Sequence, residues 1–322
     1  IFLYGFPWVS FSLIISSIDY LSFCLKYFGT FITSYLVIQI FCLPFLLINN
    51  KFQKYQLVFT LLIFIPLFIS LFISFINDKN NIYKSNKINI EIFQLNFQNT
   101  IDKSKAAQNL SIIKKNILNS DSEILIFAEN NYPYLIKNIK KNEIQNIVKK
   151  NQIIIIGATR LENNNYYNSL LNITKSNILY FDKKILVPFG EFLPLRNLLS
   201  FMESISGSND YTIGNKERYI KIDNNLSYIP VICYEIIFYW KLINDLNYKS
   251  NFIVNLTNDI WFGKFLGPYQ HFYLSKLRAA EFNKIIIRVS NNGISGIINE
   301  EGKILSTIKL NDSSSKKYSI DV

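Results

Sequence analysis

Two long apolar segments near the N-terminus constrain the fold more than any other feature of the sequence. Residues 27–48 and 56–76 contain no aspartate, glutamate, lysine or arginine. As a helix, each segment is long enough to cross a hydrocarbon core of about 30 Å. A pair of buried helices in a large soluble core is the alternative interpretation, but two uncharged runs in succession favour membrane spans. We therefore predict that both segments cross a bilayer.

The residues around these segments predict how the chain is oriented. A further apolar run near 8–18 follows Trp8, a residue type that is enriched at membrane interfaces. The connection between the two predicted spans carries Lys51 and Lys54, and the positive-inside rule places such a loop in the cytoplasm. We expect a partial transmembrane domain at 1–76, a polar linker at 77–86 and an extracytoplasmic catalytic domain at 87–322.

Composition excludes several classes of function. The net charge is +11, but the lysines are scattered rather than gathered with aromatic residues, so we expect no nucleic-acid partner. Of the three cysteines, Cys24 and Cys42 lie in apolar stretches, which leaves no disulfide framework and no zinc pattern. The single histidine, His271, cannot supply a multi-histidine metal site. We expect neither a metal nor a cofactor.

The rest of the chain alternates between β-rich and helical patterns, which predicts an α/β sandwich. Strands are predicted at 88–95, 123–128, 153–158, 166–173, 227–233, 252–256, 285–289 and 294–298. Helices are predicted at 103–118, 134–150, 236–246 and 268–282. The chain then ends in what reads as a polar tail.

Chemically capable side chains follow strand-like segments in three places. In α/β folds the loops at the carboxyl ends of strands carry the working residues. Glu129 and Cys233 each come at the end of a predicted strand, and Lys183 precedes a loop shaped by a proline and a glycine. Taken singly, Cys233 reads as a small buried hydrophobe and Glu129 as a surface or capping acid. Together they form a base, a nucleophile and an amine that can hold an oxyanion.

This set resembles the Glu-Lys-Cys triad of the nitrilase superfamily. The segments LVPFGE, VICYE, NDIWFG and GPYQHFYLSKLRAAEFN, which begin at residues 186, 231, 258 and 267, are similar to the apolipoprotein N-acyltransferase family. GFPW at 5–8 and DYLSF at 19–23 resemble that family's membrane domain. The resemblance implies a nitrilase-like α-β-β-α sandwich attached to an N-terminal bundle of transmembrane helices. It also implies a multi-pass protein of the bacterial inner membrane whose catalytic domain lies on the periplasmic side.

The resemblance further implies a reaction. A fatty acyl chain passes from a membrane phospholipid to a cysteine thioester, and from there to the N-terminal amine of a diacylglyceryl-cysteine apolipoprotein. Cys233 would be the nucleophile, Glu129 the general base and Lys183 the group that stabilises the oxyanion. Further residues are implied to serve the site: Glu191 beside the lysine, Tyr234 through its backbone N–H, Glu235 next to the nucleophile, and Trp261 and Phe262 at the substrate entrance.

The chain departs from this family in identifiable places. Ala128 stands where a proline is usual, and Ile260 stands where a small or hydroxyl residue is common. Several membrane helices and a closing C-terminal helix of the family have no counterpart, so we expect the sequence to be a piece of a longer protein. Residues 192–205 are rich in leucine and read either as an arm that dips into the membrane interface or as an amphipathic helix on the sheet.

Other interpretations of the chemistry remain open at this stage. A membrane-tethered amidase of the nitrilase type would use the same three residues on a small amide, and a non-catalytic scaffold could retain the domain. His271 lies on a predicted helix and could act as an acid or base, but beside a complete triad we interpret it as structural. We expect Arg278, Glu281 and Arg288 to form internal ion pairs or hydrogen bonds.

Overall fold

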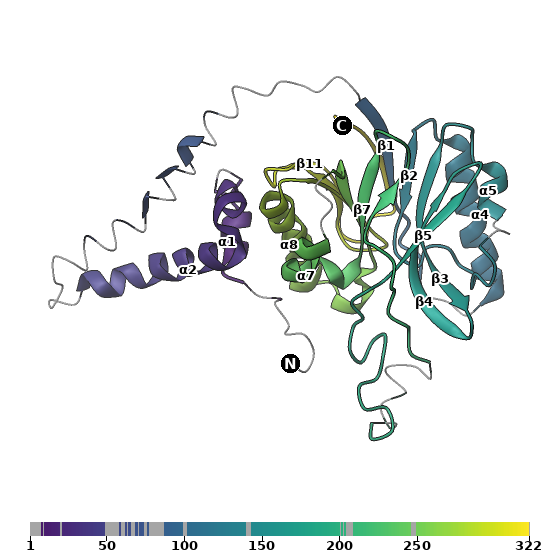
Figure 1. Ribbon diagram of the computed structural model, residues 1–322, viewed down its shortest axis with the longest axis horizontal. Coiled ribbons are helices and arrows are strands. Elements are labelled where there is room, and N and C mark those ends of the chain that lie inside the picture. Colours follow the sequence, from purple (N-terminus) through teal and green to yellow (C-terminus); the bar gives the residue numbers. More distant parts are fainter. Residues whose placement is uncertain are drawn as a thin grey trace.

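Two β-sheets packed face to face form the body of the molecule, and helices cover their outer faces (Figure 1). The structure is a computed structural model. It describes residues 8, 10–19, 21–48, 58, 62, 64–65, 68–69, 71–73, 76, 87–98, 102–139, 143–199, 201, 203, 209–245 and 249–321. The expected α-β-β-α sandwich is therefore confirmed for the described residues between 87 and 321.

The first sheet has six strands in the order β12-β1-β2-β3-β4-β5. Its strands are β1 (Lys87–Gln94), β2 (Ile124–Phe127), β3 (Ile153–Glu162), β4 (Asn165–Ile173), β5 (Ile178–Asp182) and β12 (Ser314–Asp321). The strands β1, β2 and β3 are parallel neighbours, and β12 pairs antiparallel with β1. The polar tail noted in the sequence forms β12, a strand that was not predicted: its backbone completes this sheet, and Ile320 is buried opposite Ile88.

The second sheet also has six strands, in the order β11-β10-β9-β8-β7-β6. Its strands are β6 (Ile220–Lys221), β7 (Ser227–Ile232), β8 (Phe252–Thr257), β9 (Ile285–Ser290), β10 (Ser295–Ile298) and β11 (Ile304–Ile308). The central strands β7, β8 and β9 are parallel, and their β-branched side chains are buried on both faces, as parallel sheets require.

Helices close both outer faces. The helices α4 (Lys103–Asn119) and α5 (Glu143–Ile147) cover the first sheet, and α7 (Tyr239–Asp245) and α8 (Leu266–Phe282) lie on the side of the second (Figure 1). Helix α4 is capped by Asp102, whose carboxylate accepts from the Ser104 N–H at 2.8 Å. Its buried face is spaced by three and four residues, at Ala106, Leu110, Ile113 and Ile117.

The helix predicted at 134–150 is mostly wrong. Only α5 forms within it, and the described residues 134–139 are not helical. The reason is that this segment runs beside β3, where the Ile136 N–H donates to the Thr159 carbonyl at 3.0 Å and Leu161 donates back to Ile136 at 2.9 Å. An extended pairing with the sheet replaces helical hydrogen bonds there.

The N-terminal segment forms helices next to α8 (Figure 1). The helix expected near 8–18 is reduced to α1 (Ser12–Ser16), and the segment predicted at 27–48 lies within α2 (Phe23–Ile48), which breaks at Gly29. Among the described residues, one helix, Cys24–Phe45, is long and apolar enough to cross a membrane. Most of the predicted span at 56–76 and all of the predicted linker at 77–86 lie outside the described residues.

Candidate active site

Cys233 lies on a sharp turn at the carboxyl end of a buried strand. It follows β7 and is the first residue of the short helix η3 (Cys233–Ile237). Its φ of 51° falls in the left-handed region that residues with a side chain rarely adopt. Such conformations persist where the surrounding structure holds them, and they cluster at functional sites. The side chain is 7 % exposed, so the sulfur is nearly withdrawn from solvent.

Lys183 approaches the same point from the first sheet. It directly follows β5, and its Nζ lies 2.8 Å from Glu191 Oε2 and 3.9 Å from Glu129 Oε1. Burial alone would lower the pKa of this ammonium, but the two carboxylates raise it well above its usual range. Lys183 is therefore a fixed positive charge in a site from which water is largely excluded.

Glu129 completes the group from the end of β2. Its side chain is buried, and it lies close enough to Lys183 and Cys233 for each of them to affect the pKa of its carboxyl. Burial raises the pKa of the Glu129 carboxyl, Lys183 opposes that shift, and Glu191 adds to it. Its backbone passes so close to β3 that a Cβ added at Gly157 would lie 2.5 Å from the Glu129 Cα. Glycine at this position of β3 therefore allows the carboxylate to reach the site.

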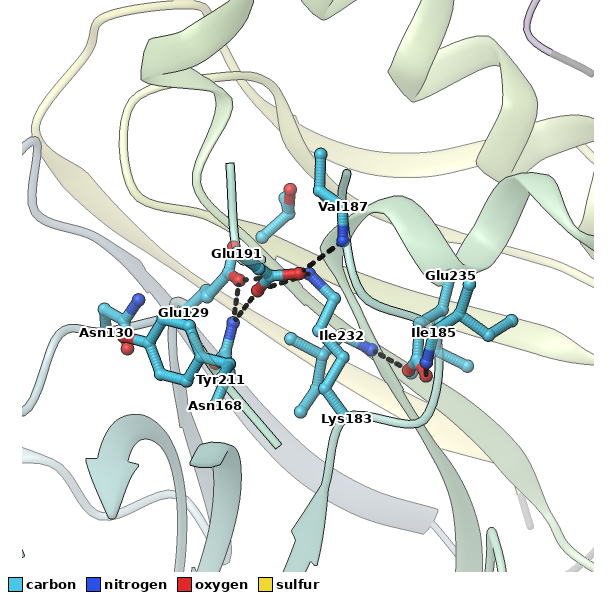
Figure 2. Close-up of polar contacts among 12 residues, drawn as sticks. Glu129, Asn130, Asn168, Lys183, Ile185, Val187, Glu191, Tyr211, Ile232 and Glu235 are labelled. Carbon is cyan, nitrogen blue, oxygen red and sulfur yellow. Dashed lines mark hydrogen bonds and ion pairs between the residues drawn. The ribbon is translucent and has the colours of Figure 1, made fainter. Parts of the chain in front are cut away.

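An asparagine that the sequence did not single out joins the two carboxylates. Asn168 on β4 donates through Nδ2 to Glu129 Oε1 and to Glu191 Oε1, each at 2.7 Å (Figure 2). Glu191 also accepts from the Val187 N–H at 2.8 Å, within the turn of the LVPFGE segment. Nothing in its local pattern distinguishes Asn168 from the other asparagines of this chain. Long-range pairing brings it to the site: it lies opposite Thr159 of β3, and its carbonyl accepts from the Lys183 N–H at 2.9 Å.

The backbone after β2 accounts for the departure at Ala128. The Ala128 N–H donates to Asn131 Oδ1 at 3.0 Å, and Asn131 in turn donates to Asn291 Oδ1 at 3.0 Å from the second sheet. A proline would have no N–H to make the first bond. This chain therefore fixes the turn that presents Glu129 with a side-chain hydrogen bond.

Glu235 does not contact the Lys183 ammonium as Glu129 and Glu191 do, but binds an arginine and backbone N–H groups. It is fully buried, pairs with Arg218 at 2.7 Å, and accepts from the backbone N–H groups of Lys184, Ile185 and Ile232. Burial works to raise the pKa of the Glu235 carboxyl, but Arg218 and these hydrogen bonds outweigh it and lower the pKa. Glu235 thus ties the loop after Lys183 to the strand before Cys233 (Figure 2). Arg218 was not anticipated from the sequence.

The electrostatics of the site suit proton transfer coupled to nucleophilic attack. Burial and, after it, the Glu129 carboxylate raise the pKa of the Cys233 thiol to about 12, although Lys183 opposes the shift. The thiol is therefore protonated at neutral pH, and a base must take its proton as the sulfur attacks. The adjacent Glu129 can do so, and the fixed charge of Lys183 can stabilise negative charge on a carbonyl oxygen.

Comparison with known proteins agrees with this geometry. A model of the carbon-nitrogen hydrolase family matches residues 92–315. This chain belongs to the carbon-nitrogen hydrolase family. Solved members share its fold: a CN-hydrolase superfamily protein from Xanthomonas campestris (TM-score 0.57, 13% identity) and Nit3 from Saccharomyces cerevisiae, a member of branch 10 of the nitrilase superfamily (TM-score 0.56, 16% identity). Each match covers 74% of this chain and 91% of the chain in the solved structure.

Curated relatives of this carbon-nitrogen hydrolase are more similar in sequence. The apolipoprotein N-acyltransferase of Rickettsia typhi is 38% identical over 181 residues, which are 53% of this chain and 36% of the relative. That of Wigglesworthia glossinidia brevipalpis is 34% identical over 247 residues, 70% of this chain and 48% of the relative. The chain thus spans less than half the length of these relatives.

In this family member, the two side chains expected at the substrate entrance differ in their exposure to solvent. Both lie on the short helix η4 (Asp259–Phe262), but Trp261 is 72% exposed whereas Phe262 packs between Trp8 and His271. Tyr234, expected to contribute its backbone N–H, is buried, and its ring packs edge-on against Phe238. Its role as an oxyanion donor stays a prediction.

A second buried polar cluster lies beside Cys233 in this carbon-nitrogen hydrolase. Arg288 Nη2 donates to Asp259 Oδ2 at 2.7 Å, and His271 Nδ1 lies 2.8 Å from Asp259 Oδ1. Burial lowers the pKa of His271 and Arg288 lowers it further, so this histidine is neutral and enclosed. The structural interpretation of His271 and the ion pair expected of Arg288 agree with these contacts. Within the described residues no group of three or more potential ligands could hold a metal ion.

Proposed function

We propose that the chain is the catalytic part of a phospholipid:apolipoprotein N-acyltransferase of the bacterial inner membrane. The observation that carries the proposal is the convergence of buried Glu129, Lys183 and Cys233 at one point between the two sheets. Two further features support it. Curated relatives that match this chain are named apolipoprotein N-acyltransferase, and one described helix is apolar enough to cross a membrane.

The first half-reaction forms the thioester. Glu129 takes the proton of the Cys233 thiol while the sulfur attacks the ester carbonyl carbon of the phospholipid. Lys183 stabilises the oxyanion, with the Tyr234 backbone N–H as the second donor we propose. The C–O bond then breaks, and Glu129 returns its proton to the departing alkoxide, so that lysophospholipid leaves and the acyl chain remains on sulfur.

The second half-reaction transfers the acyl chain. The α-amine of a diacylglyceryl-cysteine apolipoprotein attacks the thioester carbonyl, Glu129 accepts a proton from the attacking nitrogen, and the C–S bond breaks. The sulfur regains that proton and the enzyme is restored. Trp261, on the exposed side of η4, is placed to meet an apolar substrate, and Glu191, Asn168 and Glu235 hold the charged groups in position.

The test is intact-protein mass spectrometry of the full-length enzyme incubated with phospholipid. We expect a mass increase of one fatty acyl chain that hydroxylamine removes, and its absence in Cys233→Ala and Cys233→Ser. A small acyl adduct formed from amide substrates alone would favour an amidase. A folded enzyme that forms no adduct with lipid present would contradict the proposal.

A further inference from the structure

The N-terminal helix is interrupted where it meets the catalytic domain. Within α2, Gly29 adopts φ 63° and ψ −179°, so the helix breaks and restarts at Thr30. A restarted helix has N–H groups without intrahelical partners. Glu281 on α8 supplies an acceptor: its Oε1 receives the Thr30 N–H at 2.7 Å and the Thr30 hydroxyl at 2.9 Å. A carboxylate of the catalytic domain therefore caps the second part of α2.

Glycine makes this approach possible. A Cβ added at Gly29 would lie 3.3 Å from Glu281 Oε1, and the positive φ would strain any other residue. The break in α2 is thus matched to the position of one side chain on α8.

Arg278, one turn earlier on α8, closes the arrangement. Its guanidinium forms an ion pair with Glu281 and donates to Thr30 Oγ1 at 2.8 Å. The Thr30 hydroxyl therefore donates to the carboxylate and accepts from the guanidinium at once. The side chains of Arg278 and Glu281 are 1% and 7% exposed, so water competes little for these bonds.

The same guanidinium reaches the turn that carries the nucleophile. Arg278 Nε donates to the Ile236 carbonyl at 3.1 Å, and Nη2 lies 3.4 Å from the Ile237 carbonyl. These are the last residues of η3, whose first residue is Cys233. One buried side chain thus bonds both to the N-terminal helix and to the nucleophile turn.

We propose that Thr30, Glu281 and Arg278 form a clamp that positions Cys233, so that the thiol keeps its reactive geometry only while α2 is docked on α8. The clamp residues are positioning residues, since none of them touches the thiol. The strained φ of Cys233 needs support from its surroundings, and Glu235 with Arg218 supplies it at the strand side of the turn. The clamp supports the turn at its other end, where Arg278 bonds to the carbonyls of Ile236 and Ile237.

The inference rests on the proposed acyl transfer for its biological meaning, but part of its test does not depend on it. In the full-length enzyme we would measure two rates: thioester formation with phospholipid, and alkylation of Cys233 by iodoacetamide, located by peptide mass. Releasing the turn should slow the first, because the sulfur leaves its place beside Glu129, and should speed the second, because the thiol becomes more accessible.

We expect thioester formation to fall about tenfold in Glu281→Gln and about fivefold in Thr30→Val, the size of a lost buried hydrogen bond. Alkylation should rise by about threefold or more in both. Thr30→Ser keeps the hydroxyl, so both rates should stay at their wild-type values in this variant. Asp19→Asn is the control, because Asp19, in the turn before α2, accepts from Lys276 of α8 at 3.0 Å and so also joins the N-terminal segment to α8, but through a residue outside the clamp.

The clamp is overturned if Thr30→Val alkylates at or below the wild-type rate with an unchanged thermal midpoint, or if Asp19→Asn changes both rates as much. Should Glu281→Gln fail to fold, the pair Thr30→Val and Thr30→Ser still decides the question. A wild-type enzyme that forms no thioester would refute the proposed function, while the alkylation rates would still test the clamp.

Discussion

As the proposed general base, Glu129 must be ionised to accept the thiol proton, yet burial favours its neutral form. Its pKa is raised above the ordinary glutamate value of 4.5. The rate of thioester formation should therefore fall on acidification, with an apparent pKa above that value. Glu129→Gln should lower the rate by about 10²–10⁴-fold. Stopped-flow or quenched mass spectrometry between pH 4 and 8 would check both, with Lys184→Gln, at a neighbouring position outside the triad, as control. An acid limb at or below 4.5 would contradict this assignment.

Glu235 should make the free energy of unfolding depend on pH. A carboxyl whose pKa is lowered by folding stabilises the folded protein at neutral pH, whereas a carboxyl whose pKa is raised does the opposite. The pKa of Glu235 in the folded protein is lowered, so its contribution is fully present above 4.5 and is lost as pH falls through the lower folded value. Glu235→Gln leaves Arg218 buried without its charge partner and should cost about 3–5 kcal/mol at neutral pH. Urea unfolding at pH 7 and pH 4 should show the difference from wild type shrinking in acid. A difference that stays constant would argue against the ion pair.

At the scale of elements, the strongest apolar patterns were predicted correctly and the weaker ones were not. The strands predicted at 227–233, 252–256 and 285–289 correspond to β7, β8 and β9, which the structure shows to be parallel. Buried parallel strands need continuous β-branched runs, and such runs are visible in the sequence. Strand β12 was missed because it carries exposed serines and lysines, and β11 because it is short and mostly not buried. Only their pairing with β1 and β10 makes them strands. The same holds at the site, where Asn168 and Arg218 are recruited by long-range packing.

The segment 192–205 offers a prediction at this scale. Among its described residues, Leu195, Leu198 and Phe201 are 61%, 73% and 76% exposed, which does not fit a helix packed on the sheet. We propose the membrane-arm interpretation. The double change Leu198→Ser and Phe201→Ser should lower the apparent affinity of the full-length enzyme for its phospholipid donor by about tenfold or more, since each apolar side chain leaving lipid costs roughly 1.5–3 kcal/mol. The dependence of the thioester-formation rate on phospholipid concentration in mixed detergent micelles would measure it. Ile112→Ser on α4 is the control, because Ile112 is also exposed. An equal loss of affinity in this variant and in the double variant would contradict the membrane-arm interpretation.

The arrangement of the whole molecule follows from where its proposed substrates reside. Both carry acyl chains anchored in a bilayer, and moving a chain into water costs roughly 0.8 kcal/mol per CH₂. A catalytic domain tethered by apolar helices avoids that cost. Because lipoprotein amines are presented outside the cytoplasm in the proposed reaction, we expect the sandwich to lie on the periplasmic side, which the lysines at 51 and 54 also predict from sequence.

That orientation can be measured in spheroplasts that hold the full-length protein. A cysteine introduced at Ser176, an exposed turn residue of the catalytic domain, should react with a membrane-impermeant maleimide in intact cells. A cysteine at Lys51 should react only after permeabilisation, because the positive-inside rule places that residue in the cytoplasm. The protein without either change gives the background from its native cysteines. The reverse pattern would place the active site away from its proposed acceptor, and the acyl donor and acceptor would then have to be sought in the cytoplasmic leaflet.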